Sequence, residues 1–225
     1  VPASLSRAVS CADGRVVKPH VILFVAVDWY FCLHWLSLAC ALRDAGYAVT
    51  VLTEVTDEAM RVRIHAARLG LIPLRLSRRS INLLAELRTL RSVVRALRAQ
   101  RPDVLHAIAQ KPVLYGAIAA RLAGTHALVA TFAGMGYLFT SRSLSARVLR
   151  PLVMFAYRRL LVRRQVRVIV QNPDDGEQIQ RQAGIKPVLI RGAGVNLNRF
   201  RPRPEAPGTL TVILASRLLW DKGVG

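Results

Sequence analysis

Two cations near the end of the chain have the residue types and the spacing to bind a diphosphate. Arg217 and Lys222 lie five residues apart, directly after the apolar stretch 210–215, which has the pattern of a strand. A guanidinium offers a fixed fork of donors and an ammonium a mobile charge, so both could oppose the charge of a diphosphate and of a leaving group formed from it. The alternative is a pair of solvated surface charges, the usual state of such side chains.

Two short glycine-rich loops, each after a predicted strand, could also contact a ligand. Their candidate residues are Gly134, Gly136 and Tyr137 in the loop 133–137, and Arg191, Gly194 and Asn196 in the loop 191–196. Glycine lets backbone N–H groups approach a phosphate or a sugar closely, although both loops could equally be tight turns. The chain has no GxGxxG motif after its first predicted strand and no P-loop motif. This disfavours dinucleotide-dependent oxidoreductases and P-loop NTPases.

Single polar side chains near predicted strand ends are further candidates. Asp28 could accept a hydrogen bond from a sugar hydroxyl, or it could cap the helix that follows. His34 could bind a ligand such as a diphosphate, or form a buried, hydrogen-bonded ring. His106 is expected toward the ligand end of its strand. The spacing of the three cysteines fits neither a metal site nor an even disulfide set, so we predict no metal and a reducing compartment.

The elements that must position these residues alternate along the chain. Strands are predicted at 20–27, 49–52, 71–76, 103–106, 127–131, 166–170 and 188–190, with helices at 30–45, 57–69, 83–97, 113–123, 144–163 and 173–183. Short apolar strands separated by amphipathic helices predict an α/β fold, a doubly wound, Rossmann-like parallel sheet. In such sheets ligands bind beyond the carboxyl ends of the strands, where Asp28, His106 and both glycine loops should lie.

The helix predicted after Ser80 carries a regular apolar pattern. One buried stripe is expected from Leu83, Leu87, Leu90, Val94 and Leu97. Four arginines follow the stripe one position later, at 88, 91, 95 and 98, and should flank it at the water edge.

The chain divides into four predicted segments. A tail at 1–18 is followed by the Rossmann-like domain at 19–198, a Pro-rich linker at 199–208, and the first strand and loop of a second domain at 209–225. We expect the chain to be a piece of a longer protein, without a secretory signal in its first 18 residues. The apolar stretch 21–42 is interrupted by Asp28 and His34, which favours a strand and a helix over a membrane span.

The amino-acid composition predicts that the binding partners are negatively charged. The 225 residues carry 33 Lys and Arg against 13 Asp and Glu, a formal net charge of +20, and 52% are hydrophobic, which excludes a disordered basic tail. The stretch 142–167 holds eight arginines and no acid, with apolar residues between them. It indicates a helix resting on an anionic membrane surface, or a solvated helix. Nucleic-acid binding is an alternative function, but no binding motif or aromatic stacking platform supports it.

An ordered series of motifs resembles glycosyltransferase family 4, whose members are retaining nucleotide-sugar enzymes of GT-B fold. The series is DWYF at 28–31 with His34, ALRDAGY at 41–47, RSIN at 79–82, KPVLYG at 111–116, AGMGY at 133–137, VQNPDD at 170–175, GAGVN at 192–196, and SR with KG at 216–223. The nearest subgroup comprises N-acetylhexosaminyltransferases that extend lipid-linked oligosaccharides. The resemblance therefore implies the N-terminal, acceptor-side half of a GT-B architecture and the start of the donor-binding half.

The resemblance also implies the reaction. A sugar would move, with retention, from a UDP-linked nucleotide-sugar donor to a polyprenyl-diphosphate-linked or polysaccharide acceptor, without a metal or other cofactor. The enzyme would work in the cytoplasm, on the inner face of the cell membrane. Arg217 and Lys222 would hold the donor diphosphate, and Tyr30, His34 and Lys111 would lie on the acceptor side with both glycine loops.

The chain departs from the family pattern at three positions. Asn196 stands where members of the family often have Asp, and Trp35 stands where a basic residue is expected. Ala133 stands where some members have His. The Glu-rich donor motif of the second domain is absent, so no catalytic residue is assigned and the chain alone is not expected to catalyse transfer. An inactive gene product is the remaining alternative.

Overall fold

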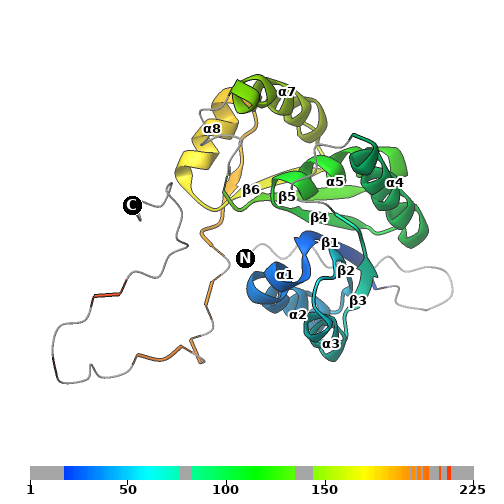
Figure 1. Cartoon of the computed structure of the whole chain (residues 1–225), viewed down its shortest axis with the longest axis vertical. Helices are drawn as coiled ribbons and strands as arrows, with labels where there is room; N and C mark the ends of the chain where they lie inside the picture. Colours follow the sequence, from blue (N-terminus) through cyan, green and yellow to red (C-terminus); the bar gives the residue numbers. More distant parts are fainter. Residues whose placement is uncertain are drawn as a thin grey trace. The chain divides into compact units, whose positions relative to one another are not determined.

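In the computed structural model the chain contains a seven-stranded parallel sheet with helices on both faces (Figure 1). The structure describes residues 18–76, 83–134 and 144–192, together with 194–195, 197–198, 200–202, 208 and 212–213. The chain divides into two compact units, residues 1–193 and 194–225. The predicted linker and second domain stay predictions, because most of the second unit lies outside the described residues.

The strands follow the order β3-β2-β1-β4-β5-β6-β7 across the sheet. They are β1 (His20–Val27), β2 (Ala48–Glu54), β3 (Gly70–Pro73), β4 (Val104–Ile108), β5 (Ala127–Phe132), β6 (Val166–Val170) and β7 (Val188–Leu189). From β1 the chain builds the sheet outward in one direction to β3, then crosses back to β4 and builds outward in the other. The topological switch point therefore lies between β1 and β4, and the predicted doubly wound fold is confirmed.

Helices connect all successive strands. They are α1 (Asp28–His34), α2 (Leu36–Asp44), α3 (Glu58–Ala66), α4 (Leu83–Gln100), α5 (Gln110–Ala123), α7 (Leu144–Leu161) and α8 (Pro173–Ala183). Local chemistry sets several ends. The Asn172 side chain accepts a hydrogen bond from the N–H of Asp175 at the start of α8, and Gly124 and Gly184 take left-handed conformations at the ends of α5 and α8.

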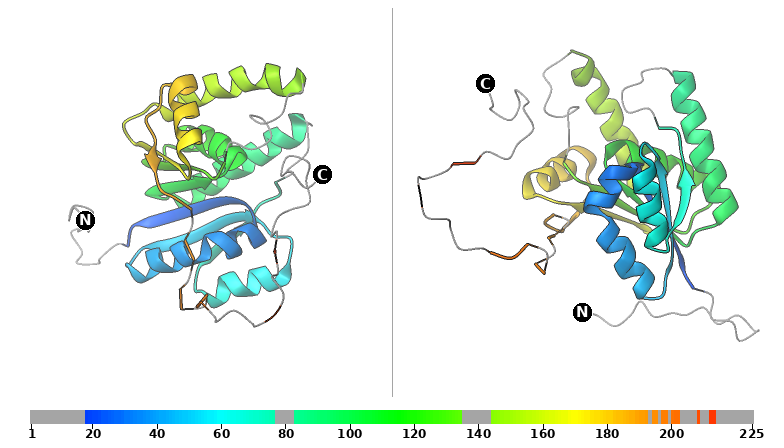
Figure 2. Two further views of the ribbon diagram at one scale, coloured as in Figure 1. Left: turned by 90° about the vertical axis from the view of Figure 1, so that its left-hand side faces the viewer. Right: turned by 60° about the horizontal axis from the view of Figure 1, so that its bottom comes forward.

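Alternate side chains of the strands form two separate cores, one on each face of the sheet. Figure 2 shows the ribbon of the sheet and its helices from two further directions. Ile22 and Phe24 of β1 point into the core beneath α4, α5, α7 and α8. Leu23 and Val25 point into the core beneath α1, α2 and α3. The second core includes no residue of β5, β6 or β7 among those described, so the sheet is only partly covered on that face.

Two details of the predicted helices are wrong. The single helix expected at 30–45 is two helices, α1 and α2, which meet at Trp35, where ψ is −8°. The Trp35 ring is buried at this break, against His106. In α4 the expected stripe holds only in part, because Leu87 is exposed whereas Val93 and Leu97 are buried. Only the C-terminal turns of α4 pack fully on the core; its four predicted surface arginines are exposed.

Candidate functional site

A pocket of about 370 Å³ lies on the partly covered face of the sheet, beside α1 and α2. Its walls come from the junction of the two helices, from β4, β5 and β6, and from the segment after β7. They consist of His34, Trp35, Leu38, Leu42, His106, Thr131, Ile169, Gln171, Ile190 and Gly192. Thr131, Gln171 and Ile190 stand at or just beyond the carboxyl ends of their strands, the edge at which such sheets bind ligands.

His106 and Thr131 form the polar floor of the pocket. His106 lies in the middle of β4, rather than at its end, and Thr131 lies on the neighbouring β5. Nε2 of His106 and Oγ1 of Thr131 share a hydrogen bond of 2.8 Å. Burial lowers the pKa of His106 to about 4, so its ring is neutral at neutral pH. The pair therefore offers uncharged hydrogen-bonding groups.

Trp35 closes the pocket from the junction of α1 and α2. Its ring meets the His106 ring edge to face, with 5.8 Å between the ring centres. The indole Nε1–H is buried and, within the part of the chain that the structure describes, has no hydrogen-bond partner. A buried donor without a partner costs about 1–3 kcal/mol, so such groups commonly bind ligand or water.

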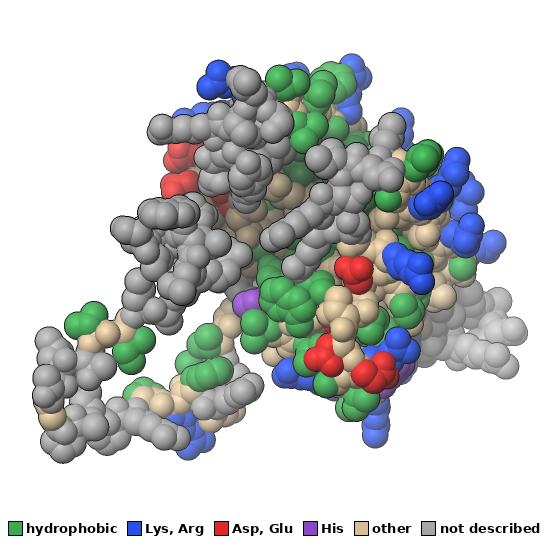
Figure 3. Space-filling model, viewed as in Figure 1, with side chains coloured by type: hydrophobic (Ala, Val, Ile, Leu, Met, Phe, Trp, Pro, Cys, Tyr) green, Lys and Arg blue, Asp and Glu red, His purple; other side chains and the backbone are tan. Residues whose placement is uncertain are grey.

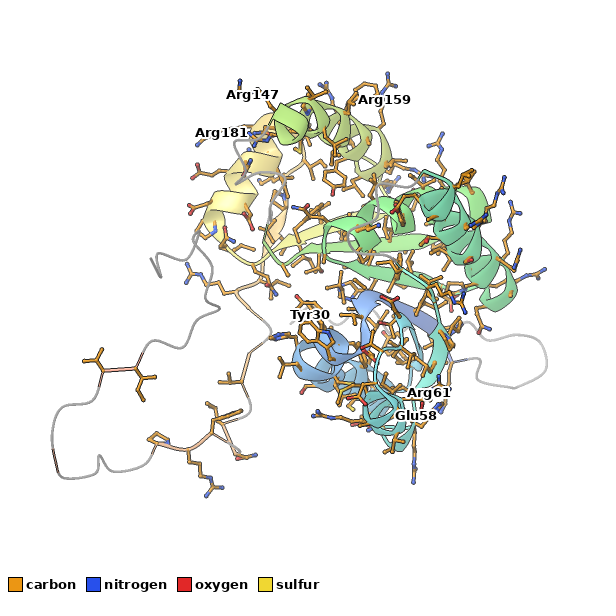
Figure 4. The ribbon with its side chains drawn as sticks, in the orientation of Figure 1. Tyr30, Glu58, Arg61, Arg147, Arg159 and Arg181 are labelled. Carbon is orange, nitrogen blue, oxygen red and sulfur yellow. The ribbon has the colours of Figure 1, made fainter. Side chains whose placement is uncertain are left out.

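The remaining walls are mostly apolar. His34 is exposed at the end of α1, and its ring lies 4.8 Å from that of Tyr30, which projects from α1 (Figure 4). Leu38, Leu42, Ile169 and Ile190 supply apolar side chains, and no Asp, Glu, Lys or Arg is among the described residues that line the pocket. Apolar walls with a few uncharged polar groups suit a neutral polar ligand with an apolar side, such as a sugar ring.

Asp28 does not line this pocket. It is fully buried at the end of β1, and its carboxylate accepts hydrogen bonds from the N–H and hydroxyl of Thr56 and from the N–H groups of Asp57 and Trp29, at 2.7–3.0 Å. Burial raises the pKa of Asp28, but these hydrogen bonds together lower it below its ordinary value. The carboxylate joins β1 and α1 to the segment that precedes α3, and Val27 rather than Asp28 occupies the N-cap position.

Lys111 lies in a different cluster, on the other face of the sheet. Its Nζ is 2.8 Å from a carboxylate oxygen of Glu86, and the Tyr115 hydroxyl donates to the other oxygen. Burial and the hydrogen bond to Glu86 raise the pKa of Tyr115. These contacts tie α5 to α4, so the acceptor-side role of Lys111 stays a prediction.

The loop residues are only partly described. Gly134 has a φ of +100°, which favours glycine, and Arg191 is exposed next to Gly192 of the pocket wall. Gly194 belongs to the second unit. Gly136, Tyr137, Asn196, Arg217 and Lys222 lie outside the described residues, so the diphosphate site stays a prediction.

Most residues of the pocket wall were not among the candidates predicted from the sequence. Thr131 and Gln171 could have been found, because each is a polar residue at the end of a predicted strand. Trp35 was noted only as a departure from a family pattern, and nothing in the sequence places Leu38 or Ile169 in a pocket.

The described residues contain neither a metal-ligating cluster nor a membrane-spanning helix. In these parts of the chain, no three His, Cys, Asp or Glu side chains gather where they could ligate a metal. None of the helices described there is long and apolar enough to cross a bilayer.

Comparisons with known proteins agree with this arrangement. Residues 20–172 match the sequence model of a family described as "Glycosyl transferase 4-like". No curated protein matches the chain.

Several solved structures share the fold. A glycosyltransferase from Rickettsia africae has a TM-score of 0.54 at 15% identity, over 84% of this chain and 47% of that one. A sucrose-phosphate synthase from Thermosynechococcus elongatus has a TM-score of 0.57 at 18% identity, over 83% of this chain and 51% of that one. Anabaena HepE, solved with UDP and glucose, has a TM-score of 0.57 at 17% identity, over 83% of this chain and 47% of that one.

At these identities the likeness concerns the fold alone. It confirms the predicted architecture, a Rossmann-like half of the GT-B type. The chain spans about half the length of each of these structures.

Proposed function

The chain belongs to the glycosyl transferase 4-like family, and from this premise we propose that it is the acceptor-side half of a sugar transferase. The donor is a UDP-linked hexose or N-acetylhexosamine. The acceptor is a polyprenyl-diphosphate-linked saccharide or a growing polysaccharide, reached from the cytoplasmic side of a membrane. The sugar is transferred with retention and without a metal or other cofactor.

The pocket beside α1 and α2 supports this proposal most strongly. Its polar groups include the neutral His106, Thr131, Gln171 and the indole N–H of Trp35, which has no partner among the described residues, set among apolar side chains. Uncharged donors and acceptors match sugar hydroxyl or acetamido groups, whereas a diphosphate needs cations or a series of N–H groups. We therefore assign the pocket to a sugar of the acceptor, and the donor diphosphate to Arg217 and Lys222.

The proposed reaction needs little protein chemistry beyond positioning and charge. The acceptor hydroxyl oxygen forms a bond to the anomeric carbon of the donor, the bond from that carbon to the diphosphate breaks, and the hydroxyl proton goes to the departing diphosphate. Arg217 and Lys222 offset the charge that develops on the leaving group. His106, whose pKa of about 4 makes it a weak base, orients the acceptor through hydrogen bonds and takes no proton.

A transfer assay on the complete product of the gene tests the proposal. Labelled UDP-sugars are offered with a polyprenyl-diphosphate-linked saccharide, and the anomeric configuration of the product is determined by NMR. We expect Arg217→Ala to lower turnover by about 10²-fold or more, because it removes a charge that stabilises the leaving group. Arg91→Ala, an exposed change of the same type on α4, is the control. Full activity of Arg217→Ala would refute the diphosphate assignment, and an inverted product would refute retention.

The pocket assignment has its own measurement. In this chain labelled with nitrogen-15, the indole N–H signal of Trp35, identified by its loss in Trp35→Phe, should shift when the saccharide part of the acceptor is added. Thr131→Val should weaken that binding by about 10-fold, since it removes one hydrogen bond while keeping the shape. A Trp35 signal that stays fixed while other signals shift would place the saccharide elsewhere.

A further inference from the structure

The outer face of α7 is apolar as well as its inner face. Val148, Leu152 and Phe155, spaced by four and three residues, are 68%, 61% and 59% exposed, and Val162 continues the row just beyond the helix. The inner side is already packed: Met154, Tyr157 and Leu161 are buried. A surface helix of a globular domain normally shows polar residues outward, so the outer row indicates a contact beyond this domain.

The buried polar group on the inner side of α7, the Tyr157 hydroxyl, has a hydrogen-bond partner. The Tyr157 hydroxyl donates to the carbonyl of Gln110, at 3.3 Å, and the Tyr157 ring meets that of Phe132 edge to face at 5.2 Å. The helix is therefore fixed on the sheet through one side. Its outer row, which consists of Val148, Leu152, Phe155 and Val162, is not needed for that packing.

Arginines surround this row. Arg147, Arg158 and Arg159 are exposed on α7, and Figure 4 shows Arg147 and Arg159 projecting outward from it. The Arg159 guanidinium lies over the Phe155 ring, 5.2 Å from its centre, so the charge sits directly beside the apolar row. The space-filling view shows hydrophobic and basic side chains together over α7 (Figure 3).

Acidic residues are absent from this part of the sequence. No Asp or Glu occurs between Asp103 and Asp174, a stretch that includes all of α7. The next acids along the chain lie on α8, where Glu177 forms a salt bridge with Arg181. The surface of α7 thus combines an apolar row with the exposed Arg147, Arg158 and Arg159, which form no salt bridge with the described acids.

We infer that the outer face of α7 docks on an anionic lipid bilayer. The apolar row enters the boundary between headgroups and acyl chains, and the arginines bind lipid phosphates while their stems lie along the apolar surface. A nucleic acid would use the arginines but would leave the Val, Leu and Phe side chains in water. The inference deepens the proposed function and rests on it, because the docked face would bring the domain to the membrane that holds a lipid-linked acceptor.

The position of α7 fits this arrangement. The helix follows β5 in the sequence, and β5 ends with Thr131 and Phe132 at the carboxyl edge of the sheet. Because Thr131 also lines the pocket, the N-terminal end of α7 and the pocket belong to the same edge of the sheet. The pocket lies on the face of the sheet that α1, α2 and α3 cover, and α7 lies on the other face, so the two share the carboxyl edge but not a face.

Vesicle sedimentation with the whole chain tests the inference. The vesicles are phosphatidylcholine alone, or phosphatidylcholine mixed with phosphatidylglycerol, and no sugar or nucleotide is present. We expect binding to the mixed vesicles only. Arg158→Gln with Arg159→Gln should lower the partition coefficient by about 10–30-fold, at roughly fivefold per charge. Leu152→Ser with Phe155→Ser should lower it by about 10-fold or more, since apolar burial is lost.

Matched variants on other helices serve as controls. Arg88→Gln with Arg91→Gln removes the same charge from α4, and Val62→Ser removes an exposed apolar side chain from α3. Circular dichroism must show that every variant is folded. Binding that is equal on both kinds of vesicle, or losses for the α4 pair as large as for the α7 pair, would overturn the inference.

Two further outcomes would also overturn it. A chain that is dimeric by light scattering and becomes monomeric in Leu152→Ser would show that α7 contacts a second copy. Binding of DNA that depends on Leu152 and Phe155 would assign the face to nucleic acid. Vesicle binding without any sugar transfer by the complete gene product would, in contrast, refute only the proposed function.

Discussion

Helices cover the two faces of the sheet to different extents. On one face α4, α5, α7 and α8 form a continuous core with β1, β4, β5 and β6, whereas on the other α1, α2 and α3 form a core with β1, β2 and part of β4. Right-handed crossovers explain the difference: connections that build the sheet toward β3 lie on one face, and those that build it toward β7 lie on the other. The strand order therefore leaves an open stretch of sheet for the pocket.

The largest contrast between the faces should appear in stability. Phe24→Ala, in the covered core, is expected to lower the free energy of unfolding by about 3–5 kcal/mol, because a fully buried ring is replaced by a cavity. Ile169→Ala, in the pocket wall, should cost about 1 kcal/mol or less. Urea denaturation measures both, and equal losses would show that the second face is as closely packed as the first.

A second contrast is a pH dependence confined to the pocket. The folded pKa of His106, about 4, lies below its ordinary value of 6.5, so the unfolded chain binds a proton that the folded chain does not. Stability should therefore fall by about 1.4 kcal/mol per pH unit as the pH decreases from 6.5 to about 4. His106→Gln should lack this component. If the two proteins lose stability in parallel, the His106 ring is not held neutral by burial.

Asp28 sharpens the comparison, because the α1–α3 side adds this fully buried carboxylate link to its apolar core. Asp28→Asn is expected to cost about 1–3 kcal/mol at neutral pH. Because the pKa of Asp28 is lowered below 3.8 in the folded state, its contribution is present above about pH 4 and is lost as the pH falls further. Thermal unfolding at several pH values should show that the difference in stability between variant and wild type becomes smaller in acid. A difference in stability that does not change with pH would contradict the prediction.

The smallest effect is expected for Trp35→Phe. Trp35→Phe should change the free energy of unfolding by about 1 kcal/mol or less, since the lost ring volume is offset by removal of a buried donor that has no partner among the described residues. Trp35→Ala should cost about 3–5 kcal/mol. Chemical denaturation compares the two. A Phe variant as unstable as the Ala variant would show that the indole N–H is bonded within the fold.

Much of the architecture could be predicted, because it depends on signals that are local in sequence. The strands 20–27 and 166–170 were predicted with their observed bounds, and Asn172, Gly124 and Gly184 mark helix ends through their own backbone and side-chain chemistry. The prediction of one helix through Trp35 was wrong. The apolar periodicity continues through this residue, but the structure has a break between α1 and α2 there, where Trp35 is buried against His106.

The sequence by itself determined the order and type of the elements, the parallel sheet, and the family likeness, since periodicity and capping act within a few residues along the chain. Only the tertiary structure decided that Trp35, His106 and Thr131 surround one pocket while Asp28 and Lys111 are held elsewhere. It also decided that both sides of α7 are apolar but only one is packed. The physical reason is that burial and hydrogen-bond partners depend on residues far away in the sequence, which the strand order alone brings together.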